Sequence, residues 1–298
     1  MRPIVGWFPA LMAMLACSGA LAQPAPTASP STAPSTRPRP GSPVPADQPA
    51  PRLDANSRLA HEQLLEKAKR GGIDVYFEGD SITRRWGASD PQYAAMLANW
   101  RQNFFGWNAA DFGWGGDTTQ NILWRLQNGE LDGVHPKVIV LLAGTNNIGR
   151  QPADDAKVAE ITRGIKAIVD LCHEKAPDAT IILTAIFPRN DNPAVMPSIN
   201  RINENLARLA DGKRVRFLNV NDKLADKGGK LFDGMMGDRL HPTVKGYQVW
   251  ADGLRPILTE LLGPPAATDH APSPTGDPSA IRRPAPSTRP TTEGQRAP

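Results

Sequence analysis

Four short polar motifs contain residue types that could together perform acyl transfer. The first is Gly79-Asp80-Ser81, in which a serine follows the apolar run at residues 73–77. A serine on such a turn, at the start of a helix, has backbone N–H groups nearby that stabilise negative charge beside its Oγ. Taken alone, Gly-Asp-Ser is also a common turn or helix-cap sequence. Ser81 is therefore a candidate nucleophile only if other catalytic groups accompany it.

A candidate general base comes from the motif Asp238-Arg239-Leu240-His241, which precedes the last predicted helix. An Asp and a His three residues apart on one turn can place the carboxylate against the imidazole, which fixes the tautomer and orients the other nitrogen. A lone surface pair is the alternative interpretation. The other histidines lie on predicted helices, before a proline or in the C-terminal tail: His61, His173, His135 and His270.

Two more motifs offer hydrogen-bond donors for an oxyanion. Within the glycine-rich residues 113–119, the backbone N–H of Gly116 can approach a substrate closely. Asn146 follows the apolar run at residues 138–142 and can direct its side-chain NH₂ toward the same place. Both segments could instead be ordinary turns. The glycine-rich motif lacks the spacing of a phosphate-binding loop.

Apolar runs alternate with amphipathic segments through the middle of the chain. The expected strands are residues 73–77, 110–113, 138–142, 180–184 and 215–220. The expected helices are residues 91–103, 120–127, 154–174 and 199–210, and a last one that carries Tyr247 to Leu261 and that Pro256 should kink or shorten. This alternation predicts an α/β domain of three layers, α/β/α, around a parallel sheet. Ligands bind at the carboxyl ends of such strands, which is where the motifs fall. Cys172 lies on a helical apolar stripe and is expected in the core.

The two ends of the chain differ from this middle region. Residues 1–22 have a basic start, a short apolar stretch and an Ala-x-Ala site, which is typical of a secretory signal peptide and predicts export to the periplasm or beyond. The apolar stretch is too short for a membrane anchor, and Pro9 interrupts it. Lipid attachment at Cys17 is an alternative, although Met14 and Leu15 are unfavourable residues before such a site.

Proline-rich sequence flanks the predicted domain on both sides. Residues 23–52 contain 10 prolines and residues 264–298 contain 9, so both are expected to be disordered or extended linkers. Residues 53–263 are expected to form one domain, which is large enough to bury a core without metals or disulfides. The net charge of +4 is spread over tails and domain, which does not favour a nucleic-acid partner. No metal or other cofactor is expected, and no transmembrane segment in the mature protein.

Together, the four motifs resemble the conserved blocks of the SGNH hydrolases, the family of GDSL lipases and esterases. Further segments resemble the branch formed by the catalytic subunits of platelet-activating-factor acetylhydrolase: residues 115–119, 123–126, 128–131 and 136–140. The resemblance implies a flavodoxin-like fold with a five-stranded parallel sheet. It implies that Ser81 is the nucleophile, that Asp238 and His241 complete a triad, and that Gly116, Asn146 and the N–H of Ser81 bind the oxyanion.

Two departures from the family pattern accompany these motifs. Ile82 stands where the motif's name has Leu, and Asp111 stands where the second block often begins with Asn, which could alter the local turn.

These implications predict a secreted serine esterase that hydrolyses short-chain, acetyl-type esters of a small molecule or a glycan. The alternatives are a catalytically silent glycan-binding module of the same fold, a carbohydrate O-acetylesterase with narrow polysaccharide specificity, and a metal-dependent esterase or phosphatase. Related acetylhydrolase subunits can pair, so a homodimer is a further expectation. The tryptophans near the motifs either line a sugar or acyl pocket or pack helices against the sheet: Trp86, Trp107, Trp114 and Trp124.

Overall fold

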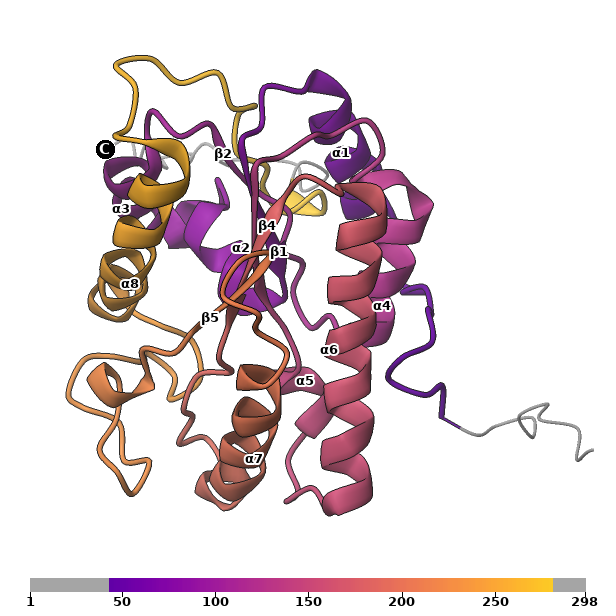
Figure 1. Cartoon of the computed structure of the whole chain (residues 1–298), viewed down its shortest axis with the longest axis vertical. Helices are drawn as coiled ribbons and strands as arrows, with labels where there is room; N and C mark the ends of the chain where they lie inside the picture. Colours follow the sequence, from indigo (N-terminus) through magenta and orange to yellow (C-terminus); the bar gives the residue numbers. More distant parts are fainter. Residues whose placement is uncertain (1–42, 281–298) are drawn as a thin grey trace, which may run out of the picture. The chain divides into compact units, whose positions relative to one another are not determined.

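A five-stranded parallel sheet forms the centre of the structure, a computed structural model that describes residues 43–280 (Figure 1). The strands are β1 (Val75–Gly79), β2 (Ala109–Asp111), β3 (Val138–Leu142), β4 (Thr180–Thr184) and β5 (Val215–Leu218). Their order is β2-β1-β3-β4-β5, and every neighbouring pair is parallel. All five expected strands are present, with ends that differ from the prediction by at most two residues.

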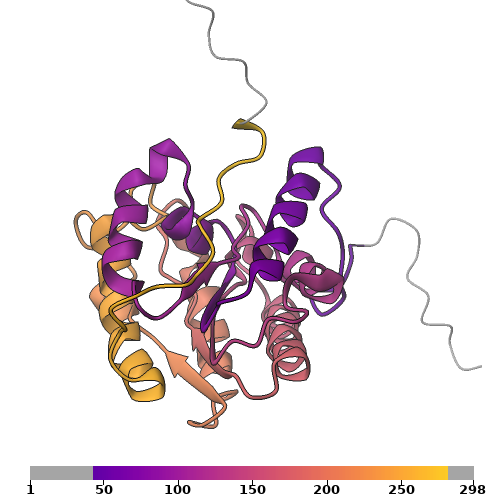
Figure 2. The ribbon, with the colours of Figure 1, turned by 90° about the horizontal axis from the view of Figure 1, so that it is seen from above.

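Helices cover both faces of the sheet, because successive side chains of a strand point to opposite faces and both must be buried (Figures 1 and 2). One face carries α1 (Ala55–Arg70), α4 (Thr119–Arg125), α6 (Asp155–Lys175) and α7 (Met196–Ala207). The other face carries α2 (Ser81–Gly87), α3 (Ala94–Phe104) and α8 (Val244–Leu262). The single turn α5 (Thr145–Ile148) follows β3. The prediction of a three-layer α/β/α fold is confirmed.

Short helical turns complete the path of the chain. The 3₁₀ turns are η1 (Pro91–Tyr93), η3 (Pro193–Val195) and η4 (Asn221–Lys223), and the π turn η2 (Leu126–Glu130) directly follows α4. Gly129 in η2 has φ 105°, a conformation that glycine adopts without strain, so the helix expected at residues 120–127 ends in a tight turn.

The two cores differ in composition. The first is mainly aliphatic and includes Cys172, which is fully buried as predicted. The second is rich in aromatic side chains and includes Trp86 and Trp107. Trp114 belongs to neither core but is only 8% exposed. These three tryptophans therefore pack inside the protein. Trp124 is half-buried and belongs to neither core.

The expectation that Pro256 shortens the last helix is wrong, because α8 continues past it to Leu262. Pro256 lies on the exposed side of α8, so the carbonyl that loses its helical partner faces solvent. The buried side is held by apolar side chains that are all fully buried: Tyr247, Trp250, Leu254 and Leu258.

Residues 43–52 pack against the domain, so the prediction of a disordered linker is wrong for this part of residues 23–52. Ala46 is fully buried, and its N–H donates to Glu160 Oε1 at 3.0 Å while its carbonyl accepts from Thr119 Oγ1 at 2.7 Å. Gly164 in α6 makes room for it, since a Cβ at Gly164 would lie 2.5 Å from the Ala46 carbonyl. The proline-rich composition of the segment gives no indication of these polar backbone contacts, which hold it against the domain.

Residues 264–280 likewise run along the domain rather than leaving it, which corrects the prediction for this part of residues 264–298. The N–H of Ala266 donates to the carbonyl of Gly106 at 2.9 Å, and Asp269 accepts from the N–H of Gly106 at 2.8 Å. Farther on, Asp277 bonds Asn56 in α1 at 3.0 Å.

The predicted signal peptide at residues 1–22 and Cys17 lie outside the described residues, as do residues 23–42 and 281–298 of the predicted linkers. Within residues 43–280, none of the helices combines the length and apolar character that crossing a membrane requires.

Candidate active site

The polar motifs meet at the carboxyl edge of the sheet, around the point where the strand order reverses. β1 has β2 on one side and β3 on the other, and an order of this kind creates a crevice at the strand ends. Ser81 begins α2 directly after β1, Gly116 lies in the loop after β2, and Asn146 lies in α5 after β3. His241 reaches the same edge from the loop before α8.

Ser81, His241 and Asp238 form a continuous hydrogen-bonded chain. Ser81 Oγ lies 2.8 Å from His241 Nε2, and His241 Nδ1 lies 2.7 Å from Asp238 Oδ2. The second carboxylate oxygen of Asp238 accepts from the backbone N–H of His241 at 2.8 Å. The three residues that the sequence singled out as a triad are therefore brought together, and the imidazole is oriented from behind by the carboxylate.

The turn that carries Asp238 and His241 is fixed by its own backbone. Arg239 has a positive φ of 66°, and its carbonyl accepts from the N–H of Asn190 at 2.8 Å. The N–H of Gly237 donates to the carbonyl of His241 at 2.9 Å. Thr243 then caps α8 through its hydroxyl. These bonds set the direction of the imidazole before any substrate arrives.

Burial and charge keep the imidazole of His241 neutral. Burial lowers the pKa of His241, the positive charge of Arg85 lowers it further, and the bond and charge of Asp238 act in the opposite direction, so that the net pKa shift is downward. Burial acts to raise the pKa of Asp238, but hydrogen bonds from the backbone and ring of His241 hold that pKa well below its usual value. The result at neutral pH is an ionised carboxylate beside a neutral imidazole, which can accept a proton.

Three N–H groups at this edge of the sheet are candidate oxyanion donors: the backbone N–H groups of Ser81 and Gly116 and the side-chain amide of Asn146. Among residues 43–280, no hydrogen-bond acceptor contacts the backbone N–H of Ser81 or of Gly116, whose φ of 80° suits only glycine without strain. Asn146 Nδ2 donates to the carbonyl of Asp117 at 2.8 Å, which ties α5 to the loop after β2 and leaves its second N–H for another acceptor. The N–H of Trp114 in that loop donates to the carbonyl of Gly79 at 3.1 Å.

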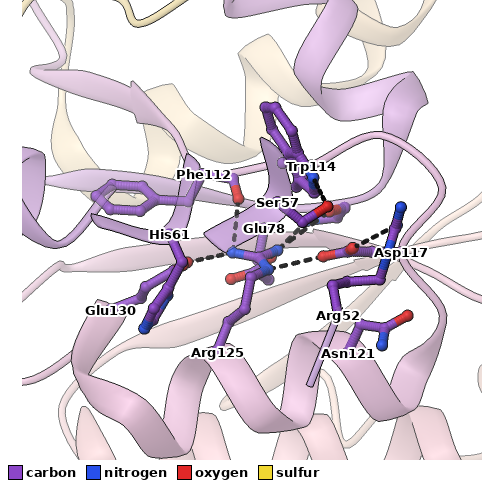
Figure 3. Close-up of polar contacts among 12 residues, drawn as sticks. Arg52, Ser57, His61, Glu78, Phe112, Trp114, Asp117, Asn121, Arg125 and Glu130 are labelled. Atoms are coloured by element: carbon purple, nitrogen blue, oxygen red, sulfur yellow. Dashed lines mark hydrogen bonds and ion pairs between the residues drawn. The ribbon is translucent and has the colours of Figure 1, made fainter. Parts of the chain in front are cut away.

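A buried charge cluster lies behind these loops, and Arg125 of α4 is its centre (Figure 3). Arg125 donates from Nε to Asp117 Oδ2 at 2.7 Å and from Nη2 to Glu78 Oε1 at 2.6 Å. Its Nη1 pairs with Glu130 and donates to the carbonyl of Phe112 at 3.0 Å. One guanidinium therefore links the end of β1, the loop after β2 and the turn η2.

Two further contacts complete the charge cluster. Arg52, from the ordered N-terminal segment, donates to the carbonyl of Gly115 at 3.0 Å and to Asp117 Oδ1 at 3.4 Å, so both oxygens of Asp117 are bound by arginines (Figure 3). Burial raises the pKa of Glu78 to about 8, despite the opposing charge of Arg125. Glu78 therefore holds a proton at neutral pH, which reduces the repulsion among the buried carboxylates.

The sequence assigned no role to Arg52, Glu78, Arg125 or Glu130. Arg125 and Glu130 lay inside the segments that carried the family resemblance, but in sequence an arginine on a short helix looks like a surface residue. Glu78 gave a usable signal, since it is a charged residue within the strand Val75–Gly79, which is buried throughout.

The departure at Asp111 leaves the local turn in place. Asp111 Oδ1 accepts from the N–H of Gly113 at 2.8 Å, as an Asn side chain at this position could also do. Burial raises the pKa of Asp111 to about 6, although the charge of Lys67 opposes the shift. Lys67 is itself buried and donates to the carbonyl of Asp111 at 2.6 Å.

Residues 43–280 contain no group of three or more His, Cys, Asp or Glu side chains arranged to hold a metal ion. The carboxylates of the buried charge cluster instead surround Arg125.

Comparison with known proteins shows the family of this chain. A model of the "GDSL-like Lipase/Acylhydrolase family" matches residues 77–249, a region that contains all the residues of the candidate site. The chain belongs to this GDSL-like family. Its relatives include platelet-activating factor acetylhydrolase IB subunit alpha1 of Bos taurus, which is 33% identical over 240 residues that cover 78% of this chain and 97% of the relative. The same subunit of Homo sapiens is 34% identical and covers 73% of this chain and 91% of the relative.

The fold is shared with solved members of the GDSL-like family. A GDSL-like lipase from Bacteroides thetaiotaomicron superposes with a TM-score of 0.53 at 19% identity, covering 68% of this chain and 98% of the other. The flavodoxin-like fold and the family resemblance seen in the sequence are thus confirmed. As a member of the GDSL-like family, the protein is a carboxylic ester hydrolase.

Proposed function

We propose that this protein is a serine esterase that hydrolyses short, acetyl-type esters through Ser81, His241 and Asp238. The observation that carries the proposal is the 2.8 Å contact between Ser81 Oγ and His241 Nε2, with His241 Nδ1 bound to Asp238. The family membership supports ester hydrolysis, and the relatives named as acetylhydrolases support a short acyl group.

In the first half of the proposed mechanism, His241 accepts the proton of Ser81 Oγ as that oxygen attacks the ester carbonyl. Asp238 stabilises the imidazolium that forms and remains ionised. The carbonyl oxygen becomes an oxyanion, and the N–H groups of Ser81, Gly116 and Asn146 donate to it. The imidazolium then gives its proton to the leaving alcohol as the C–O bond breaks, which leaves the acyl group on Ser81.

In the second half, His241 removes a proton from a water molecule that attacks the acyl-enzyme. The same donors bind the second oxyanion, and the proton returns from His241 to Ser81 Oγ as the carboxylic acid leaves. The lowered pKa of His241 suits this role, because a base must be unprotonated at working pH to accept a proton.

We also propose that the protein is exported, since residues 1–22 have the pattern of a signal peptide. Sequencing the N-terminus of the protein secreted by its native host tests this proposal. A mature chain that starts after Ala22 is expected, and an uncleaved chain retained inside the cell would contradict it.

A test of the catalytic proposal compares Ser81→Ala with the full chain on p-nitrophenyl acetate. Loss of the nucleophile should lower kcat on the order of 10⁴–10⁶-fold, without loss of the folded state. Ser198→Ala is the matched control, because Ser198 is a buried serine on α7 that bonds Ala153. Equal activity of Ser81→Ala and the control would overturn the proposal, and no activity in the unmutated chain would favour the binding-module alternative.

A further inference from the structure

Trp124 differs from the other tryptophans that the structure describes. Five of them are at most 8% exposed: Trp86, Trp100, Trp107, Trp114 and Trp250. Trp124 is half-buried, belongs to neither core, and has its ring 4.9 Å from the ring of His61 at a tilt of 57°. A large aromatic side chain that packs in no core and remains accessible is a common feature of ligand sites.

Trp124 lines a pocket of about 210 Å³ between α1, α4 and the loop after β2. Besides Trp124, its walls include Arg52, Arg58, His61, Glu62, Trp114 and Arg125. The guanidinium of Arg125 is already bound by the carboxyl groups of the buried charge cluster. The volume is below the roughly 300–1,000 Å³ typical of sites for drug-sized ligands. It is sufficient for one sugar ring and too small for a long acyl chain.

The polar groups of this pocket include both donors and acceptors. Arg58 and Glu62 lie one helical turn apart on α1, and within residues 43–280 neither side chain forms an ion pair. His61, by contrast, is bound to Glu130 at 2.7 Å. An anionic ligand requires donors alone, whereas each hydroxyl of a sugar both donates and accepts. An arginine, a glutamate and a tryptophan ring together therefore suit a neutral sugar.

The Trp124 pocket adjoins the proposed oxyanion loop. Arg52 lines the pocket and donates to the carbonyl of Gly115 at 3.0 Å. A Cβ built on Gly116 would lie 3.2 Å from the Arg52 guanidinium, so this wall of the pocket borders the proposed oxyanion donor. Trp114, another wall, is in the same loop and is held by Ser57 at 2.8 Å. A group bound in the pocket would thus border the loop that carries Gly116, the proposed oxyanion donor.

We infer that the Trp124 pocket is a subsite for a neutral sugar ring, so that the physiological substrate is an acylated carbohydrate. This inference rests on the proposed function, since it identifies the alcohol part of the ester that Ser81 cleaves. Trp124 presents its ring to the apolar face of the sugar. Arg58 donates to its hydroxyls, and Glu62 accepts from them.

The experiment measures kcat/KM on acetylated neutral oligosaccharides of xylose, glucose and mannose, and on p-nitrophenyl acetate as a substrate without sugar. In Trp124→Ala, the ratio of glycan to p-nitrophenyl activity should fall at least about tenfold for the preferred sugar, which corresponds to the loss of one well-packed contact. Trp124→Phe, which keeps a ring, should recover most of the ratio. Phe105→Ala is the control, because Phe105 is a 55% exposed aromatic residue outside the pocket, and its ratio should not change.

Each outcome separates the subsite from the esterase proposal. Hydrolysis of p-nitrophenyl acetate without hydrolysis of any acetylated oligosaccharide overturns the subsite alone, as does an unchanged ratio in Trp124→Ala. An equal loss of kcat/KM on both substrates in Trp124→Ala shows a structural role for Trp124 and also overturns the subsite. If the unmutated protein hydrolyses neither substrate, the esterase proposal itself fails. Arg58→Ala and Glu62→Gln, which change exposed residues that line the pocket, should also lower the ratio of glycan to p-nitrophenyl activity. They provide the second test if Trp124→Ala does not fold.

Discussion

The hydrogen-bonded triad and the buried charge cluster differ in how far their charged side chains are exposed to solvent. Asp238, at the rim, has a side chain that is 50% exposed and faces solvent on one side. Glu78, Asp117 and Arg125 lie behind it with side chains that are at most 4% exposed. Groups that react must be reached by substrate and water, so part of the triad stays open to solvent. The buried groups touch no solvent, and each bond they make fixes the position of a loop.

This contrast explains why changes in the two regions should have different consequences. At the rim, loss of a group should change the rate while the fold survives. In the buried charge cluster, loss of a group leaves a charge without its partner in a dry interior, which costs stability first.

The largest effect on stability is expected from Arg125→Leu. This change leaves the carboxylates of Asp117 and Glu130 buried without their cation, and breaking a buried pair in this way costs about 3–5 kcal/mol. Urea unfolding measures the change in the free energy of unfolding. The control is Lys166→Leu, which removes an exposed ion pair with Asp170 and should change stability by at most about 1 kcal/mol. Equal losses in the free energy of unfolding for the two variants would show that the buried charge cluster contributes no more to stability than an exposed ion pair.

At the rim, Asn146→Ala should mainly change the rate. Removal of one oxyanion donor typically lowers kcat about 10²–10³-fold, with a smaller effect on stability from the lost bond to the Asp117 carbonyl. Steady-state kinetics on p-nitrophenyl acetate and a thermal melt separate the two quantities. Asn205→Ala, on α7, serves as the control. An Asn146→Ala enzyme with the parental kcat would remove Asn146 from the mechanism.

A smaller and pH-dependent effect is expected from Glu78→Gln. The pKa of Glu78 is about 8 in the folded protein against an ordinary value of 4.5, so the folded state keeps a proton that the unfolded state releases. This contribution to stability is fully present below 4.5 and is lost as pH rises through about 8. Gln resembles the protonated side chain, so the variant should lose less stability over that range when unfolding is measured at several pH values. Parallel pH curves for the two proteins would argue against a protonated Glu78.

The smallest effect is expected from Arg85→Gln. Arg85 Nη1 lies 3.1 Å from Asp238 Oδ2, and its positive charge is the second cause, after burial, of the lowered pKa of His241. Its removal should raise that pKa, so the acidic limb of the pH profile of kcat/KM should move to higher pH. Arg101→Gln, on the exposed side of α3, should leave the limb unchanged. A shift to lower pH would contradict the assignment of His241 as the base.

The sequence predicted best what depends on local pattern. β3 was predicted residue for residue, because a strand buried on both faces is a continuous apolar run. The candidate triad was predicted because Ser81 and the Asp238–His241 turn have distinctive local sequences, and because four motifs occurred at strand ends.

The parts that failed depend on contacts between distant residues. Residues 43–52 looked like linker because nothing near them in sequence shows that Glu160 and Thr119 bond Ala46. Arg125 could not be recognised as buried, since its three carboxylate partners come from β1, the loop after β2 and the turn η2. Neither can be predicted without the fold.

The most direct test of the account is covalent labelling of the full chain by a fluorophosphonate, with the modified residue located by mass spectrometry. If His241 activates Ser81, a single adduct should form on Ser81, and His241→Ala should label far more slowly. Labelling at another serine, or equal rates with and without His241, would contradict the central claim.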